Sequence, residues 1–490
     1  MKDNQKPRRS KAFGIFVTIC ILLVLGSAAF VGALWMGVFE TENGPSIHLP
    51  VPGTSTPGTT QAPTETTVPP TTMPEPEKIV ATATISSMGD MLMHMPVVNS
   101  CKQNDGSYNF DKSFQFIKEY VEAADYAAAN LETTLAGTDN GYKYSGYPHF
   151  NCPDEIVDGI MGAGFDLMLT VNNHSYDTSM VGYKRTLEVV REKGMETLGT
   201  MLTPEEPKYI IQDVNGIKIG MMAYTYATDD NNDGRPSLNF NASMKEAGIC
   251  NFFTYENLPG FYKEVEGHLE AMKEEGAEAT MIFMHWGIEY QLKQNDQQAK
   301  IAQNLCDLGI DVIVGGHPHV VQPVDLLTST VDPDHKTVCL YSMGNAISNQ
   351  RLGQISYVKT SHTEDGVMFS VTFCKYSDGS VYLLSTDILP TWVHLDASKS
   401  PVSYLILPLD DTRSDQWQEL FGIGDATFEK AMKSYNRTMD IVGEGLQECQ
   451  EYLEAEGLMR DWEYLYAVNP EAAGDPPIQE TEPTEVANAA

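Results

Sequence analysis

The chain has 490 residues, of which 42% are hydrophobic and 20% are charged, and these fractions are those of a globular protein. Its formal net charge of −35 is uneven, because the first 39 residues carry +4 and the remainder carries −39. A field of this sign excludes nucleic acid as a partner, and a polyanionic ligand would need a local positive centre such as bound metal.

Residues 12–39 are the first predicted element. These 28 residues contain no charged side chain, and as a helix they are long enough to cross about 30 Å of hydrocarbon. The basic stub at 1–11 predicts a single-pass membrane protein with its N-terminus in the cytoplasm and its large domain outside. A cleaved signal peptide is the alternative, although its apolar region is normally about 7 to 15 residues long. Residues 40–77 are rich in Pro and Thr and predict an extended linker.

Apolar, β-rich runs alternate with helical patterns between residues 78 and 396. Strands are expected at 79–90, 126–132, 165–173, 280–286 and 311–316, and helices at 111–125, 153–164, 256–275 and 297–309. Asn215-Gly216 predicts a hairpin within 209–226, and strands alone are expected from 320 to 389. The alternation predicts one layered α/β domain at 78–396.

The segment 397–469 has a mainly helical pattern. It is expected either to pack on the domain or to form a small appendage. Residues 470–490 are acidic and contain several prolines, which predicts a disordered tail.

Seven cysteines follow residue 39, without any CxxC pair. Cys101 and Cys152 lie in loop-like sequence and are the best candidates for a disulfide if one forms outside the cytoplasm. Cys306 and Cys339 lie in apolar runs, which favours buried thiols.

Five short polar motifs lie at the ends of predicted strands. They are Gly89-Asp90, Asn130-Leu131-Glu132, Asn172-Asn173-His174, His285-Trp286-Gly287 and Gly316-His317-Pro318-His319. Ligands collect beyond the carboxyl ends of strands in open α/β sheets, so these motifs are expected to converge on one crevice. Carboxylate, amide and imidazole together suit Mn, Fe or Zn. Taken singly, each residue could cap a turn or be a satisfied histidine, but five such coincidences are less plausible than one metal site.

These motifs, in this order, resemble those of the bacterial poly-γ-glutamate capsule synthesis (CapA) family. The resemblance covers residues 82–350 and is most specific in HWGIEY at 285–290 and GGHPHVVQ at 315–322, with YSMGN at 341–345. That family is similar to the calcineurin-like metallophosphoesterases, which implies a four-layer α/β sandwich of two mixed sheets flanked by helices. It also implies two divalent ions, one at Asp90, Glu132 and His319 and the other at Glu132, Asn173, His285 and His317, with His174 as the general acid.

The first motif departs from the wider superfamily, because Leu92 stands where a ligating His is expected. His94 could replace that ligand, contact substrate or be structural. Asp177 could orient a histidine or cap the following helix. Glu289 and Asn345 lie in matched motifs and are further accessory candidates, and the loop 142–150 either rims the site or is a plain surface loop.

Two functions are compatible with these features. One is a phosphoesterase of the bacterial cell membrane that acts on a cell-surface polymer or its phosphorylated precursor. The other is a non-catalytic, metal-dependent subunit that binds or exports the polymer in a membrane synthesis complex. Loss of His174 would disable the enzyme but not the binding subunit.

Overall fold

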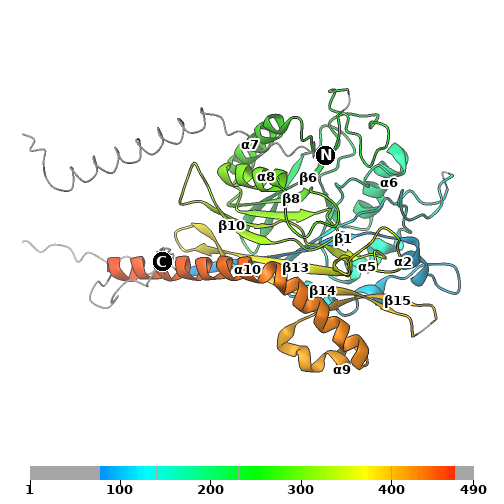
Figure 1. The fold of residues 1–490 in the computed structure, drawn as a ribbon. Helices are drawn as coiled ribbons and strands as arrows, with labels where there is room; N and C mark the ends of the chain where they lie inside the picture. Colours follow the sequence, from blue (N-terminus) through cyan, green and yellow to red (C-terminus); the bar gives the residue numbers. More distant parts are fainter. Residues whose placement is uncertain (1–77, 140, 230, 399, 469–490) are drawn as a thin grey trace, which may run out of the picture. The chain divides into compact units, whose positions relative to one another are not determined.

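The computed structural model describes residues 78–468 except 140, 230 and 399 (Figure 1). The expected stub at 1–11, the expected anchor at 12–39, the expected linker at 40–77 and the expected tail at 470–490 lie outside the described residues. Within the described part, none of the helices is both long and apolar enough to cross a membrane.

The first sheet has eight strands, and the N-terminal part of the domain forms its parallel strands. In spatial order the strands are β15 (Ser403–Pro408), β14 (Val381–Asp396), β13 (Asp365–Tyr376), β1 (Ile79–Met91), β2 (Tyr126–Asn130), β3 (Leu167–Leu169) and β4 (Glu196–Leu198), with β12 (Asn345–Ile347) paired to β1. Strands β1 to β4 run parallel, whereas β13, β14 and β15 are antiparallel to their neighbours. The sheet is therefore mixed.

The second sheet has seven strands and is also mixed. Its order is β10 (Val324–Thr328), β11 (Lys336–Leu340), β9 (Val312–Gly316), β8 (Ala279–His285), β6 (Ile217–Tyr226) and β5 (Tyr209–Val214), with β7 (Phe252–Phe253) paired to β6. Strands β6, β8, β9 and β11 are parallel. The predicted hairpin is confirmed, since β5 and β6 turn at Asn215 and Gly216, both with positive φ.

Alternate residues of the strands point to two different apolar clusters. Ala128 of β2 and Phe283 of β8 belong to a core shared by the two sheets, whereas Ala129 and Met284 face outward. Helices α2 (Met95–Ser100) and α5 (Glu155–Gly162) cover the outer face of the first sheet, and α7 (Leu258–Glu274) and α8 (Asp296–Asp307) cover that of the second (Figure 1). The expected α/β class, with two mixed sheets and flanking helices, is confirmed.

The expected helix at 111–125 is broken. It consists of α3 (Asp111–Phe114) and α4 (Lys118–Val121), because Ile117 and Tyr120 donate their backbone N–H groups to the third residue back rather than the fourth. The apolar spacing is nevertheless used, since Phe114, Ile117 and Val121 are all buried. A longer helix, α6 (Ser179–Glu192), follows the third polar motif, Asn172-Asn173-His174.

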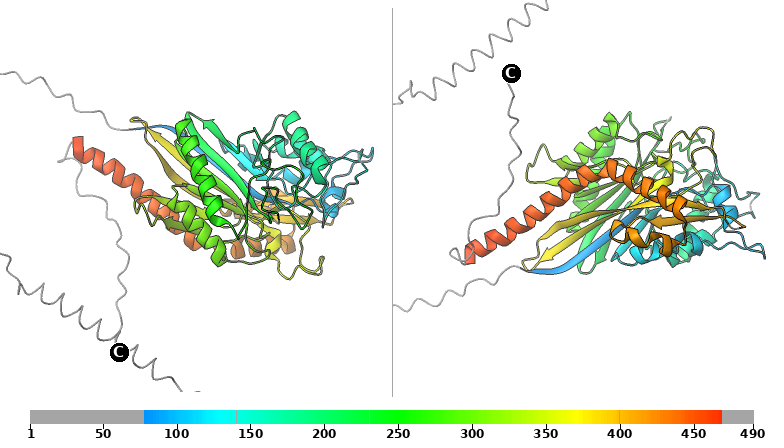
Figure 2. Two further views of the ribbon diagram at one scale, coloured as in Figure 1. Left: turned by 90° about the horizontal axis from the view of Figure 1, so that it is seen from above. Right: turned by 60° about the horizontal axis from the view of Figure 1, so that its bottom comes forward.

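The C-terminal segment packs on the domain. Its last helix, α10 (Asp425–Val468), lies along β14 and β10 and places Val442, Leu446 and Cys449 in the core between the sheets (Figure 2). The expected boundary at 396 falls between β14 and β15, which pair with each other. Strand pairing therefore continues across a boundary at which a helical extension was expected.

The candidate disulfide is not formed. Cys101 and Cys152 are free thiols in the apolar layer beneath α2 and α5, and burial raises the pKa of both. Cys306 and Cys339 are buried thiols, as expected. The candidate pairing was wrong because the loop-like sequence around Cys101 and Cys152 does not show that both side chains point into the apolar layer.

Candidate metal centre

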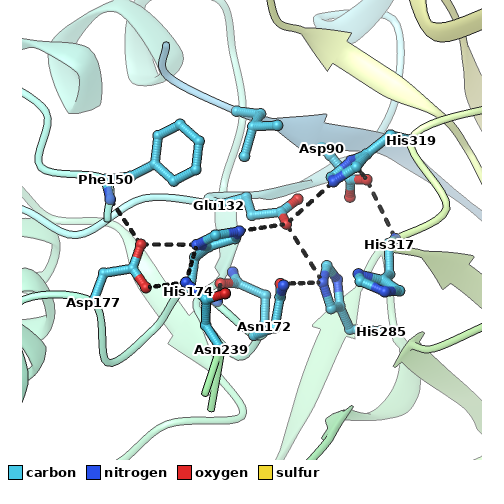
Figure 3. A network of polar contacts seen from close by, with 12 residues as sticks. Asp90, Glu132, Phe150, Asn172, His174, Asp177, Asn239, His285, His317 and His319 are labelled. Atoms are coloured by element: carbon cyan, nitrogen blue, oxygen red, sulfur yellow. Dashed lines mark hydrogen bonds and ion pairs between the residues drawn. The ribbon is translucent and has the colours of Figure 1, made fainter. Parts of the chain in front are cut away.

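All six predicted metal ligands are buried at one place, where the carboxyl ends of strands from both sheets meet. They are Asp90 of β1, Glu132 after β2, Asn173 after β3, His285 at the end of β8, and His317 and His319 after β9. Figure 3 shows Glu132 between the three histidines on one side and His174 on the other. The expectation that these motifs converge beyond the carboxyl ends of strands is therefore met by six residues, of which the first and the last are 229 positions apart in the sequence.

Glu132 lies at the centre of the cluster, and its Oε1 atom has no hydrogen-bond partner. Three imidazole Nε2 atoms surround this oxygen, at 3.6 Å from His285, 3.9 Å from His319 and 4.0 Å from His174. Burial, followed by the charges of Asp90 and other acids, raises the pKa of Glu132 well above its usual value. A buried carboxylate oxygen with no donor is costly, and ligation of a cation would remove that cost.

Asp90 is held ionised. Burial acts to raise its pKa, but the hydrogen bond and the charge of His319, with a further hydrogen bond from Asn130, bring the pKa below its usual value. Nδ1 of His319 lies 3.0 Å from Oδ2 of Asp90, and Asn130 donates to Oδ1 at 2.8 Å. The backbone N–H of His317 also donates to Oδ2, at 3.2 Å.

Two histidines are held neutral, which is the form that ligates metal. Burial lowers the pKa of His285 to about 3, and burial with neighbouring histidines lowers that of His317 well below its usual value. Nε2 of His285 lies 2.9 Å from Oδ1 of Asn173, whereas Nδ1 of His317 has no partner in the described structure. These side chains are thus suited to a cation rather than to an ion pair.

Two groups of three side chains could each hold an ion, since their ligand atoms lie within 4.8 Å of one another. One group is Glu132, His317 and His319, and the other is Asp90, Glu132 and His285. Glu132 belongs to both, as a bridging ligand would. The resemblance instead implied that Asp90 shares an ion with His319, so the assignment of each ligand to one ion stays a prediction.

Backbone strain positions the two histidines after β9. His317 has φ 95° and His319 has φ 56°, a region that residues other than Gly rarely adopt. Such strain persists only where the surrounding structure enforces it, and it is concentrated at functional sites. Gly315, just before this segment, lets the backbone of β9 lie close to that of Tyr341, because a Cβ atom at position 315 would lie 1.9 Å from the carbonyl oxygen of Tyr341.

His174 is oriented by Asp177. Its Nδ1 atom lies 2.8 Å from Oδ2 of Asp177, whose side chain is fully buried, and its Nε2 atom faces Glu132. Oδ2 also accepts from the backbone N–H of Phe150 at 2.7 Å. The alternative role, as a cap of α6, is not observed, because the cap residue is Thr178 and the structure shows no side-chain cap hydrogen bond at that helix end.

Three further residues support His174 and Asp177, and none of them was predicted as a site residue from the sequence. Asn239 donates to Oδ1 of Asp177 at 2.9 Å and lies 3.2 Å from Nδ1 of His174, although it comes from the loop between β6 and β7 (Figure 3). Asn172 accepts from the backbone N–H of His174 at 3.1 Å, and the Phe150 ring packs edge-on against His174. Asn172 stood in a recognised motif, and Phe150 in the loop 142–150, but nothing in the sequence near Asn239 indicated it.

The accessory candidates occupy different places. His94 is buried with Nε2 unpartnered, and burial lowers its pKa to about 4, but it joins neither three-residue group. Asn345 donates to the backbone oxygen of His319 at 3.2 Å and so supports a ligand. Glu289 is exposed on the turn after β8. Leu92 is buried at the end of β1.

Known proteins are similar to this chain over the region that contains the candidate metal centre. The family model "Bacterial capsule synthesis protein PGA_cap" matches residues 84–350, which include every predicted ligand. The PGA biosynthesis protein CapA of Bacillus subtilis (strain 168) is 27% identical over 267 residues, which are 54% of this chain and 63% of that protein. The capsule biosynthesis protein CapA of Bacillus anthracis is 26% identical over 276 residues, covering 54% and 60% respectively. The match thus spans less than two thirds of either curated relative.

Two solved structures show weaker likeness. The sulfate thiohydrolase SoxB of Thermus thermophilus, in complex with glycerol, matches with a TM-score of 0.36 and 12% identity over 73% of this chain and 60% of that one. The purple acid phosphatase PPD1 from yellow lupin (Lupinus luteus) seeds matches with a TM-score of 0.31 and 13% identity over 64% and 55%. Scores of this size do not assign the function.

Proposed function

Because this chain belongs to the bacterial capsule synthesis protein PGA_cap family, we propose that it is a metal-dependent phosphoesterase in the synthesis of a capsule or another cell-surface polymer. Residues 12–39 anchor it in the cell membrane, and the metallophosphoesterase-like domain acts outside on the polymer or its phosphorylated precursor. The observation that carries the proposal is the buried, unpartnered Oε1 of Glu132 within 4.0 Å of three imidazole nitrogens.

The described residues divide the chemistry between them. Asp90, Glu132 and the neutral His285 supply charge and nitrogen ligands for a divalent ion, which when bound polarises a phosphoryl oxygen and lowers the pKa of water. His174 then gives a proton from Nε2 to the leaving oxygen, because Asp177 holds Nδ1 and fixes the orientation of the ring. Asn239 and the backbone of Phe150 keep Asp177 in place.

Hydrolysis of a chromogenic phosphomonoester and a phosphodiester by the full-length chain, with Mn, Zn or Fe, tests the proposal. The variant His174→Ala should retain its metal but turn over about 10²- to 10⁴-fold more slowly, as expected for loss of a general acid. The variant His285→Ala should lose both metal and turnover. Turnover that does not depend on metal, or that is unchanged in His174→Ala, would contradict the proposal.

Asp177→Asn tests the orienting role separately from ligation. The amide cannot stabilise a protonated His174, so turnover is expected to fall about 10- to 100-fold while bound metal is unchanged. Steady-state kinetics beside metal analysis measures the two effects. Asp105→Asn, an exposed site remote in sequence, is the control and should behave as the parent chain. Equal activity of both variants would show that Asp177 does not act through His174.

One observation favours a second candidate function. Leu92 cannot ligate, and His94 lies outside both three-residue groups, so the first ion has fewer ligands than the superfamily pattern implies. A metal-dependent subunit that binds or exports polymer in a membrane synthesis complex needs ligands but no general acid. Stoichiometric metal without turnover, and polymer binding that survives His174→Ala, would support this function instead.

A further inference from the structure

A cavity of about 460 Å³ lies between the first half of α10, the segment 351–364 and β14. Four cationic side chains line it, namely Arg351, Lys430, Lys433 and Arg437. Three of them come from α10 at a spacing of three and four residues, which places them on one face of the helix. None of the residues that line this cavity is a predicted metal ligand.

The cavity is positively charged in a chain whose net charge is −35. Arg351 pairs with Glu364, and Arg437 makes an ion pair of 2.6 Å with Asp365. Lys430 and Lys433 are exposed, and neither has a hydrogen-bond or ion-pair partner among the residues that the structure describes. Two positive charges therefore remain uncompensated at its wall.

The wall formed by β14 shows the effect of these charges. His394 lies there with its ring 5.0 Å from that of Trp392. Burial, together with the charges of Arg351 and Lys430 and against the opposing charge of Asp396, lowers the pKa of His394 to about 4. His394 is therefore neutral near pH 7, and the cavity combines fixed cations with an uncharged hydrogen-bonding group.

We propose that this cavity binds a segment of an acidic polymer through its carboxylates. The identity of the polymer rests on the proposed function, whereas the charge of the cavity does not. Lysine ammonium groups are separate point charges that suit carboxylates repeated along a flexible chain. Elsewhere the chain repels a polyanion, so an uncompensated cationic wall concentrates it locally.

The cavity is joined to the metal centre by a short stretch of chain. Asn345 donates to the backbone oxygen of His319, and six residues later Arg351 lines the cavity. Arg351 donates to the backbone oxygen of Val393 at 2.6 Å, which fixes the end of this stretch against β14. A polymer held in the cavity is thus retained by the same segment that supports a ligand of the candidate metal centre.

Fluorescence anisotropy with a labelled oligo-γ-glutamate of about ten residues tests the proposal on the full-length chain, at low salt and with EDTA present. Lys430→Ala/Lys433→Ala should weaken binding about tenfold or more, because two charges near the ligand are lost. Lys430→Arg/Lys433→Arg should restore most of the affinity. The control Lys263→Ala/Lys273→Ala removes the same charge from exposed positions on α7 and should bind as the parent does.

The outcomes separate this proposal from the proposed function. Hydrolysis of the chromogenic esters should be unchanged in Lys430→Ala/Lys433→Ala, so failure of the enzyme assay leaves the binding result intact. Equal affinity of that variant and the parent would overturn the proposal. Displacement of the oligomer by inorganic phosphate at a concentration where acetate has no effect would also overturn it, in favour of a phosphate site.

Discussion

Replacing Glu132 with Gln is expected to weaken metal binding by more than about 100-fold while leaving the metal-free protein at least as stable as the parent. The side chain is fully buried, its Oε1 has no partner, and burial raises its pKa well above the usual value. A carboxyl whose pKa is raised in the folded state costs stability as pH rises above its unfolded pKa of about 4.3. The amide keeps the shape and removes the charge, so the advantage of the variant without metal should grow above that pH.

Metal analysis after dialysis, and thermal unfolding with and without EDTA between pH 5 and 8, measure both effects. Added metal should raise the unfolding temperature of the parent but not of Glu132→Gln. Glu289→Gln is the matched control, because Glu289 is exposed and belongs to neither three-residue group. A Glu132→Gln chain that retained stoichiometric metal would show that Glu132 is not the shared ligand.

Gly445→Ala is expected to lower the free energy of unfolding by about 3 kcal/mol, although Ala is the better helix former. A Cβ atom at position 445 would lie 1.8 Å from the backbone oxygen of Val324, so α10 would have to move away from β10. That movement would expose Leu446 and Cys449, which belong to the core between the sheets. The loss of packing outweighs the gain in helix propensity.

The same helix supplies the control. A Cβ atom at Gly457 would meet nothing within 4 Å, so Gly457→Ala should raise the free energy of unfolding by about 0.5 to 1 kcal/mol. Urea unfolding followed by circular dichroism compares the two variants with the parent. If Gly445→Ala proved as stable as Gly457→Ala, α10 would not be docked on β10 in solution.

The candidate ligands could be found from the sequence because each follows an apolar run that ends at the same edge of a sheet. Asp90, Glu132 and His285 are local features of that kind. Parallel pairing aligns the strand ends within each sheet, and the packing of the two sheets brings the two sets of ends together. Asn239 is different, since it reaches Asp177 from a loop 62 positions away and no periodic pattern marks it. Only the packing of the two sheets places it beside His174.

The errors in secondary structure also have physical causes. Strand β15 is buried at every position, so it lacks the alternation that identifies a half-buried strand, and a short apolar run of this kind does not distinguish strand from helix. The break between α3 and α4 leaves the apolar spacing intact, so the hydrophobic pattern does not reveal it. The inward direction of Cys101 and Cys152 likewise depends on how distant segments pack.

The pairing of β1 with β13 has a consequence for the order in which the domain can be completed. Ser86 of β1 meets Ser370 of β13 across 284 positions, whereas β2 follows β1 within a few dozen residues. Ribosomes deliver the N-terminal end first, so one edge of β1 stays unsatisfied until nearly the whole domain has been made. An open edge of this kind invites pairing with other chains, and long-range closure is slow. Truncation after His319 but before β13 should therefore yield insoluble protein that depends on chaperones, even though every candidate metal ligand has already been synthesised.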